Sequence, residues 1–166
     1  MSKEEKANFE NLEKETEIIA KKDQFVVFKI GQEEYGIYIE KVKEIIKPTK
    51  ITNVPNTPNY ILGVINLRGQ IVPVVSMLDK IGVVFSGEKD ADKERIITVE
   101  INDCLIGLKV DMVTEVLWLN DYQIEDIPED EEIKKEYLFG VSEIEDRLIM
   151  LVDLEKLLFI KKDEKK

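Results

Sequence analysis

The sequence predicts a mainly β protein, built from two tandem five-stranded β-barrels that share a core and carry short helices. Two observations predict this fold class: short β-rich runs bounded by tight turns, and an internal repeat. Residues 24–46 align without a gap on residues 95–117, and residues 60–81 align on residues 137–158. The identical pairs in the first alignment are Ile30/Ile101, Gly36/Gly107, Val42/Val113 and Glu44/Glu115.

Each repeat unit has the pattern of strand, turn, strand, strand, proline-containing loop, strand, turn, strand and short helix. Five short strands predict a small closed barrel, since closure removes exposed strand edges. A unit of roughly 65 residues buries only about 60% of its unfolded surface, so we expect the two barrels to share a core. The pattern leaves open whether the first strand of one unit completes the barrel of the other.

The repeat also sets the expected boundaries. Residues 24–83 form the first barrel, residues 84–94 a polar connecting loop, and residues 95–160 the second barrel. Residues 1–23 form a charged extension, either an amphipathic helix or a partly disordered solubilising segment. Residues 161–166 are expected to be a disordered tail. Helical spacing in the extension is seen at Phe9, Leu12, Thr16 and Ile19.

The stretch from Tyr60 to Val75 contains two apolar runs separated by the dipeptide Arg68-Gly69, which predicts a hairpin with Arg68 exposed on its turn. Pro73 has no amide hydrogen, so the second strand is expected to lie at a sheet edge or at a bulge there. The repeat has Glu145-Asp146 at the equivalent turn. The two turns therefore differ in charge.

Several other residues are expected to serve the fold. The side chains of Ser76 and Asp153 occupy equivalent positions before the two predicted helices and can cap their first N–H groups. Trp118, within the Leu117 to Leu119 run, is expected in the core, although a contact patch is the alternative. Four glycines recur at matching positions and are read as backbone requirements: Gly36, Gly63, Gly107 and Gly140.

The composition excludes several classes of catalytic site and binding partner. The chain has 166 residues, a formal charge of −11, no histidine and one cysteine, Cys104. Without histidine, the His-dependent triads and HExxH zinc sites are excluded, and one cysteine excludes an internal disulfide. The acidic balance argues against nucleic acid or anionic lipid as the main partner. The start lacks an apolar signal core and no run could insert in a membrane, so we expect a cytoplasmic protein.

Charge also separates the two units. Residues 24–83 carry seven basic and five acidic side chains, a net +2, whereas residues 84–160 carry eight and 21, a net −13. Two similar scaffolds of opposite charge are suited to different partner surfaces. An acidic face that only keeps the second unit soluble is the alternative reading.

Residues 24–160 resemble the CheW family of bacterial chemotaxis coupling proteins. The resemblance lies in FVVFKIGQEEYGIYIEKVKEII, in EYLFGVSEIEDRLIMLVDLEKLL and above all in NTPNYILGVINLRGQIVPVV. It implies a double SH3-like β-barrel that has no catalytic residue, metal or cofactor. It also implies a cytoplasmic adaptor in membrane receptor arrays, which links the tips of methyl-accepting chemoreceptors to the regulatory domain of the histidine kinase CheA. The positions implied in these contacts are Val42, Glu44, Gly63 and Arg68.

Several alternatives stay open at this stage. Arg68 can pair with Glu44 or with a carboxylate of a partner, and the repeat mate Glu115 gives Glu44 a structural reading as good as the binding one. An acid/base pair such as Asp103 with Glu115 is conceivable, but no spacing singles it out. An SH3-like module that binds proline-rich peptides outside chemotaxis is a further alternative, disfavoured by the few aromatic residues in the strands.

Overall fold

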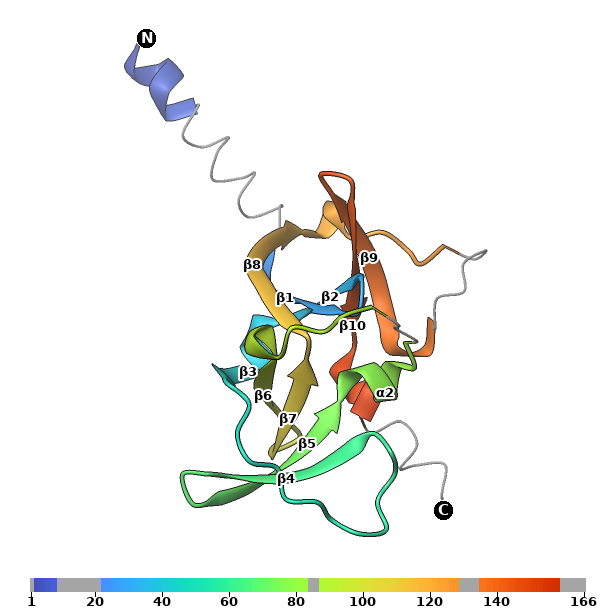
Figure 1. The fold of residues 1–166 in the computed structure, drawn as a ribbon. Coiled ribbons are helices and arrows are strands. Elements are labelled where there is room, and N and C mark those ends of the chain that lie inside the picture. Colours follow the sequence, from blue (N-terminus) through green and yellow to red (C-terminus); the bar gives the residue numbers. More distant parts are fainter. Residues whose placement is uncertain (1, 9–21, 84–86, 129–134, 159–166) are drawn as a thin grey trace, which may run out of the picture.

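The computed structural model describes residues 2–8, 22–83, 87–128 and 135–158. Its strands form two five-stranded sheets, which Figure 1 shows one above the other. Sheet A has the order β8-β1-β2-β10-β9 and sheet B the order β3-β6-β7-β5-β4. The strands are β1 (Lys22–Ile30), β2 (Glu33–Tyr38), β3 (Val42–Ile46), β4 (Ile61–Leu67), β5 (Gln70–Ser76), β6 (Arg95–Ile101), β7 (Cys104–Val110), β8 (Met112–Asn120), β9 (Leu138–Ile144) and β10 (Arg147–Val152).

Each sheet takes strands from both halves of the chain. The first hairpin, β1–β2, lies in sheet A with β8, β9 and β10, while β6–β7 lies in sheet B with β3, β4 and β5. The expected barrels over 24–83 and 95–160 therefore need correction, because the two halves exchange their first hairpins. The repeat could not reveal this exchange, since β1–β2 and β6–β7 are copies that suit either barrel.

Parallel pairing joins the two halves. Strand β10 pairs with β2 through Ile149↔Glu34, Met150↔Tyr35 and Leu151↔Gly36. Strand β5 pairs with β7 in the same way, beginning at Val74↔Gly107. All other strand pairs are antiparallel. These two ladders make each sheet continuous only when both halves are folded together.

A second contact, repeated in both halves, helps to close each sheet. The chain that follows β3 returns to the edge of β4, where the Thr52 N–H donates to the Val64 carbonyl and the Val64 N–H donates back, both at 2.8 Å. The chain that follows β8 makes the equivalent bridge from Glu125 to Val141 on β9, at 2.7 and 2.9 Å. Because β3/β4 and β8/β9 are the edge strands, the bridges link the two edges of each sheet.

The buried side chains form one large cluster between the sheets and one small cluster within each. The large cluster combines sheet A residues such as Phe28 with sheet B residues such as Leu108, which confirms a shared core. On β1, Val26 and Phe28 enter this core, whereas Phe25 and Val27 enter the interior of sheet A. A strand buried on both faces reads as a continuous apolar run, which explains FVVFKI.

Both predicted helix caps are confirmed. The Ser76 Oγ accepts from the Asp79 N–H at 3.3 Å and begins α2 (Met77–Ile81). The Asp153 Oδ1 accepts from the Lys156 N–H at 3.1 Å at the start of the helical segment 154–158. The caps are equivalent in the repeat, so the two halves end in the same way.

The expectation for Pro73 is met only locally. Strand β5 lies between β7 and β4, so it is not an edge strand. Its ladder with β7 spans only Val74, Val75 and Ser76, and therefore begins just after the proline. On the other side Pro73 lies opposite Val64, whose N–H and carbonyl are both bonded to Thr52. No ladder bond is required from the proline nitrogen.

The flanking segments differ from the expected boundaries. Residues 3–8 are helical, but Phe9, Leu12, Thr16 and Ile19 lie outside the described residues. Strand β1 begins at Lys22, so residues 22 and 23 belong to sheet A rather than to the extension. The connecting segment contains the 3-10 helix η2 (Ala91–Lys93). Residues 161–166 lie outside the described part.

Strand exchange predicts that neither half folds alone. Residues 1–83 and 84–166, produced as separate chains, should each give a poorly dispersed amide NMR spectrum, because each lacks two strands of one sheet and three strands of the other. Mixing the two chains should restore the dispersed spectrum of the intact protein. A cooperative thermal transition from either half alone would contradict the exchanged topology.

Candidate protein-interaction site

The Arg68 turn is a tight two-residue turn. Leu67 pairs with Gln70, and the φ values of Arg68 and Gly69 are 51° and 83°. Positive φ at both central residues is the type I′ geometry that suits a twisted hairpin. The Asn66 Oδ1 accepts from the Gly69 N–H at 2.8 Å, which holds the turn. The predicted hairpin is confirmed, and it presents Arg68 with 71% of its side chain exposed.

Arg68 forms a two-pronged ion pair with Glu44. The Arg68 Nη1 donates to the Glu44 Oε2 at 3.3 Å, and Nη2 donates to Oε1. The arginine holds the pKa of the Glu44 carboxyl below its usual value. Glu44 is on β3 and Arg68 follows β4, the two edges of sheet B. The pair therefore joins the two edges of sheet B, a junction that we call the seam of this barrel. Within the chain, the partner of Arg68 is Glu44.

The backbone of Glu44 is fixed by Thr98 on β6. The Glu44 N–H donates to the Thr98 Oγ1 at 3.1 Å, and the same hydroxyl donates to the Glu44 carbonyl at 3.2 Å. Thr98 is fully buried. The register of β3 shifts between Val42 and Glu44, so the strand is irregular just before the glutamate. Both features orient Glu44 before any partner is present.

Glu115, the repeat mate of Glu44, also pairs with an arginine. The Arg147 Nη2 donates to the Glu115 Oε2 at 2.5 Å and to the Glu34 Oε1 at 2.7 Å, and Nε donates to the Glu34 Oε2 at 2.9 Å. Arg147 is the repeat mate of Gln70, two residues beyond the mate of Arg68. Both barrels thus hold the glutamate with an arginine from the same hairpin. The Glu44 pair has a structural counterpart.

Val42 and Gly63 have different surroundings. Val42 is half-buried at the start of β3 and packs against the shared core. Gly63 has a φ of 143°, and a Cβ atom there would lie 2.2 Å from the Thr52 carbonyl oxygen. This carbonyl makes the bridge that closes the sheet. The backbone reading of Gly63 is confirmed. Of the four predicted site residues, which come from β3, β4 and the turn after β4, the structure brings Glu44 and Arg68 into contact.

Several apolar side chains are exposed at the surface of both sheets, and the sequence interpretation did not predict their exposure. Ile45 on β3 and Val116 on β8 are repeat mates, as are Ile71 on β5 and Leu148 on β10. Trp118 is 60% exposed, so its predicted place in the core is wrong, although Leu119 beside it is buried. Strand β8 is an edge strand, and alternation turns Val116 and Trp118 outward together. The signal available in the sequence was apolar character kept at both repeat positions.

Other site types find no support in the described part of the chain. No group of three histidine, cysteine, aspartate or glutamate side chains is placed to hold a metal ion among these residues. Asp103 lies in the β6–β7 turn, while Glu115 is engaged by Arg147. Among the described helices, none is both long and apolar enough to cross a membrane.

Two five-stranded sheets that exchange hairpins, with the Arg68–Glu44 ion pair joining the edges of one of them, define a double SH3-like β-barrel protein. Residues 24–161 match the CheW-like domain, and the chain belongs to this family. It is 39% identical over 140 residues to the chemotaxis protein CheW of Helicobacter pylori, which covers 84% of this chain and 82% of that protein. The corresponding Bacillus subtilis protein is 32% identical over 139 residues, covering 82% and 86%.

A solved structure gives the same result. The scaffolding protein TtCheW from Thermoanaerobacter tengcongensis superposes with a TM-score of 0.75 at 36% sequence identity. The match covers 82% of this chain and 88% of that chain. The sequence resemblance to the chemotaxis coupling proteins is therefore confirmed at the level of family and fold.

Gly63 provides a test of the seam. Gly63→Ala should lower the free energy of unfolding by about 3 kcal/mol, because the new Cβ atom meets the Thr52 carbonyl at an unfavourable φ. Gly69→Ala is the matched control: its φ is also positive but no atom lies within 4 Å of the added carbon, so the loss should be about 1 kcal/mol. Urea unfolding measures both. Equal losses would show that backbone strain alone, without the close approach, determines the effect.

Arg147→Gln tests the ion cluster by installing the residue of the other barrel. Glu34, whose side chain is only 12% exposed, would lose its partner, so the free energy of unfolding should fall by about 2 kcal/mol at pH 7. Arg68→Gln, at the exposed pair, should shift the thermal midpoint by less than about 3 °C. Thermal and urea unfolding of the two variants measure the contrast.

Arg147→Gln should also change how stability depends on pH in acid. The hydrogen bond from Arg147 lowers the pKa of Glu34 in the folded state. Its contribution to stability is therefore present above the ordinary glutamate pKa of about 4.3, and is lost as pH falls through the lowered value. Between about pH 5 and pH 3, the free energy of unfolding should therefore fall less in Arg147→Gln than in the unaltered protein. An unchanged acid dependence would show that Glu34 does not contribute through this pair.

Proposed function

We propose that this chain is a non-enzymatic adaptor that couples methyl-accepting chemoreceptors to the histidine kinase CheA in cytoplasmic arrays at the membrane. The observation that carries the proposal is the exposed Arg68–Glu44 pair on a hairpin tip, in a chain of the CheW-like family. The same positions are those that the family resemblance implies in partner contacts.

The pair is suited to a protein contact because it is charged and positioned in advance. Thr98 fixes the Glu44 backbone, and the turn fixes Arg68. Ile45, the residue after Glu44, is 40% exposed. An exposed arginine that is oriented in advance is typical of protein interfaces, where arginine is enriched. We infer that a receptor tip contacts this part of sheet B.

The edge strands support a helical partner. Two edge strands expose apolar side chains: Ile45 on β3, and Val116 and Trp118 on β8. Strand β3 pairs with β6 and β8 pairs with β1, and both of these neighbouring strands are largely buried. Receptor tips are helical hairpins, whose apolar stripe could lie against such side chains. The receptor contact is therefore proposed to include both edge strands.

The two hairpin arms suit the kinase. Ile71 follows the Arg68 turn in sheet B, and its mate Leu148 follows the Glu145 turn in sheet A. Each barrel thus exposes one apolar residue at the same place. The resemblance implies that the regulatory domain of CheA has the same fold, so a barrel-to-barrel contact at each end could extend into a ring. We assign the kinase contacts to these two surfaces.

The deciding experiment reconstitutes the three components. The protein, a cognate receptor tip and CheA are mixed, and kinase autophosphorylation is followed. Arg68→Glu, which places the charge of Glu145 on the first hairpin, should weaken coupling at least tenfold while the thermal midpoint stays nearly unchanged. Lys89→Glu, in the connecting segment, makes the same change in net charge and should leave coupling intact.

Two results would overturn parts of the proposal. If the unaltered protein binds neither partner and leaves phosphorylation unchanged, the adaptor function is wrong. If Arg68→Glu strongly lowers the thermal midpoint, Arg68 serves the fold rather than the contact. Normal coupling by a stable Arg68→Glu protein would remove the arginine from the receptor surface.

A further inference from the structure

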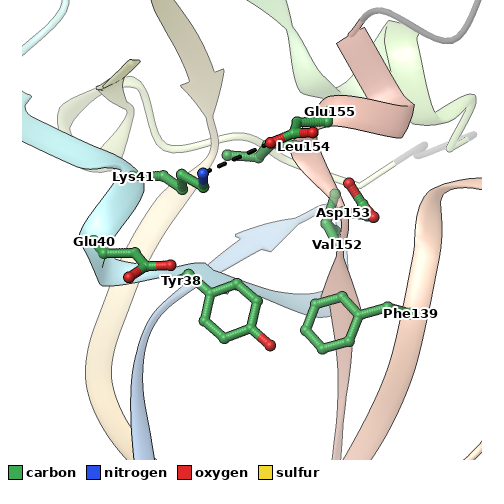
Figure 2. A pocket seen from close by; sticks show the side chains of 8 residues that line it. All are labelled: Tyr38, Glu40, Lys41, Phe139, Val152, Asp153, Leu154 and Glu155. Atoms are coloured by element: carbon green, nitrogen blue, oxygen red, sulfur yellow. Dashed lines mark ion pairs between the residues drawn. The ribbon is translucent and has the colours of Figure 1, made fainter. Parts of the chain in front are cut away.

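A cavity of about 290 Å³ lies where β2 leaves sheet A through the 3-10 helix η1 (Ile39–Lys41) and β10 runs into the final helical segment. Figure 2 shows its two ends: the rings of Tyr38 and Phe139 lie side by side at one, and Lys41 reaches Glu155 at the other. The remaining side chains that line it are Glu40, Val152, Asp153 and Leu154. Its lining is thus part aromatic and aliphatic, and part acidic.

The aromatic part is held in place from below. The ring centres of Tyr38 and Phe139 are 5.2 Å apart and the rings are within 6° of parallel. Phe25, which is fully buried, lies 4.6 Å from Tyr38 on the interior side. Tyr38 and Phe139 themselves are only half-buried. A fixed apolar surface of this kind binds an apolar stem without having to reorganise.

The acidic part makes the cavity attractive to cations. The lining contains three carboxylates, on Glu40, Asp153 and Glu155, and one lysine, Lys41. Burial raises the pKa of the Tyr38 hydroxyl first, and the charges of Asp23, Glu40, Asp121 and Asp153 raise it further. The ring therefore lies in a negative field, with carboxylates both inside and beside the cavity.

Lys41 satisfies this field only weakly. Its Nζ lies 3.7 Å from the Glu155 Oε1, and both side chains are more than a third exposed. Exposed pairs of this length contribute little to stability. An incoming cation can therefore displace Lys41 at little cost, and Lys41 itself shows that an ammonium group can be held at this rim.

The other barrel shows that the fold does not require this lining. At the repeat positions of Tyr38, Phe139 and Asp153 the chain has Lys109, Leu62 and Ser76. Sheet B forms the same ladders with these residues. The combination of stacked rings and carboxylates is thus particular to sheet A, and ordinary barrel packing does not explain it.

We propose that this cavity receives a lysine or arginine side chain from a basic segment of a protein partner. The aliphatic stem would pack on Tyr38, Phe139 and Leu154, and the cationic head would meet Glu40 and Glu155. Such charge-assisted contacts weaken with added salt, because the rim is exposed. The inference does not depend on the receptor and kinase contacts, which involve other residues.

The test uses defined probes with the full-length protein. Acetyl-Gly-Arg-Gly-amide and acetyl-Gly-Lys-Gly-amide are titrated while amide and aromatic NMR signals are recorded. Saturable shifts at Tyr38, Phe139 and Leu154 are expected. Acetyl-Gly-citrulline-Gly-amide, which keeps the shape of arginine without its charge, should bind at least fivefold more weakly.

Variants decide whether the cavity itself is the site. Phe139→Leu, which copies the other barrel, and Glu40→Gln, an exposed change, should each weaken arginine-peptide binding at least fivefold. Glu143→Gln removes a carboxylate of the same half outside the cavity and should change binding less than twofold. Amide spectra check that each variant is folded. If Phe139→Leu does not fold, Glu40→Gln still tests the proposal.

Three outcomes would overturn the proposal. The first is equal binding of the citrulline and arginine peptides. The second is equal weakening by Glu143→Gln and Glu40→Gln, since this indicates diffuse attraction to an acidic surface. The third is the absence of saturable shifts at the cavity residues. None of these results bears on kinase coupling, so this inference and the proposed function can fail separately.

Discussion

The parallel pairing of β2 with β10 and of β5 with β7 is the constraint on which the rest of the structure depends. It places the first hairpin of each half in the sheet of the other half. The apolar faces of β1 and β6 then meet in the large cluster between the sheets. Because this core and both ladders need both halves, folding the two barrels is one event rather than two.

The shared framework leaves the two barrels free to differ at their surfaces. Each holds a β-strand glutamate with a hairpin arginine, but Arg68 is at an exposed turn while Arg147 is mostly covered and bonded to two carboxylates. The equivalent glutamate–arginine pair is thus exposed in sheet B and mostly covered in sheet A. The rings of Tyr38 and Phe139 are a second difference, found where sheet B has a lysine and a leucine.

The sequence predicted what depends on local pattern. The strands, the Arg68 turn, the caps at Ser76 and Asp153 and the shared core follow from alternation, turn chemistry and the repeat. It could not show which copy of a repeated hairpin joins which sheet, because the copies are interchangeable in pattern. It misplaced Trp118, since apolar character alone does not show that β8 is an edge strand. The Arg68 partner depends on a fold-level contact across the seam.

Strand exchange also has a consequence for the origin of this architecture. A chain of one unit that kept this strand order would close its sheet by exchanging hairpins with a second copy, as a symmetric intertwined dimer. Such a dimer would dissociate and unfold on dilution. Joining the two copies in one chain, through the segment that contains η2, makes the exchange intramolecular and independent of concentration. Two copies joined in one chain need not be identical, so the two halves can carry different side chains at equivalent positions, as they do at Arg68 and Glu145.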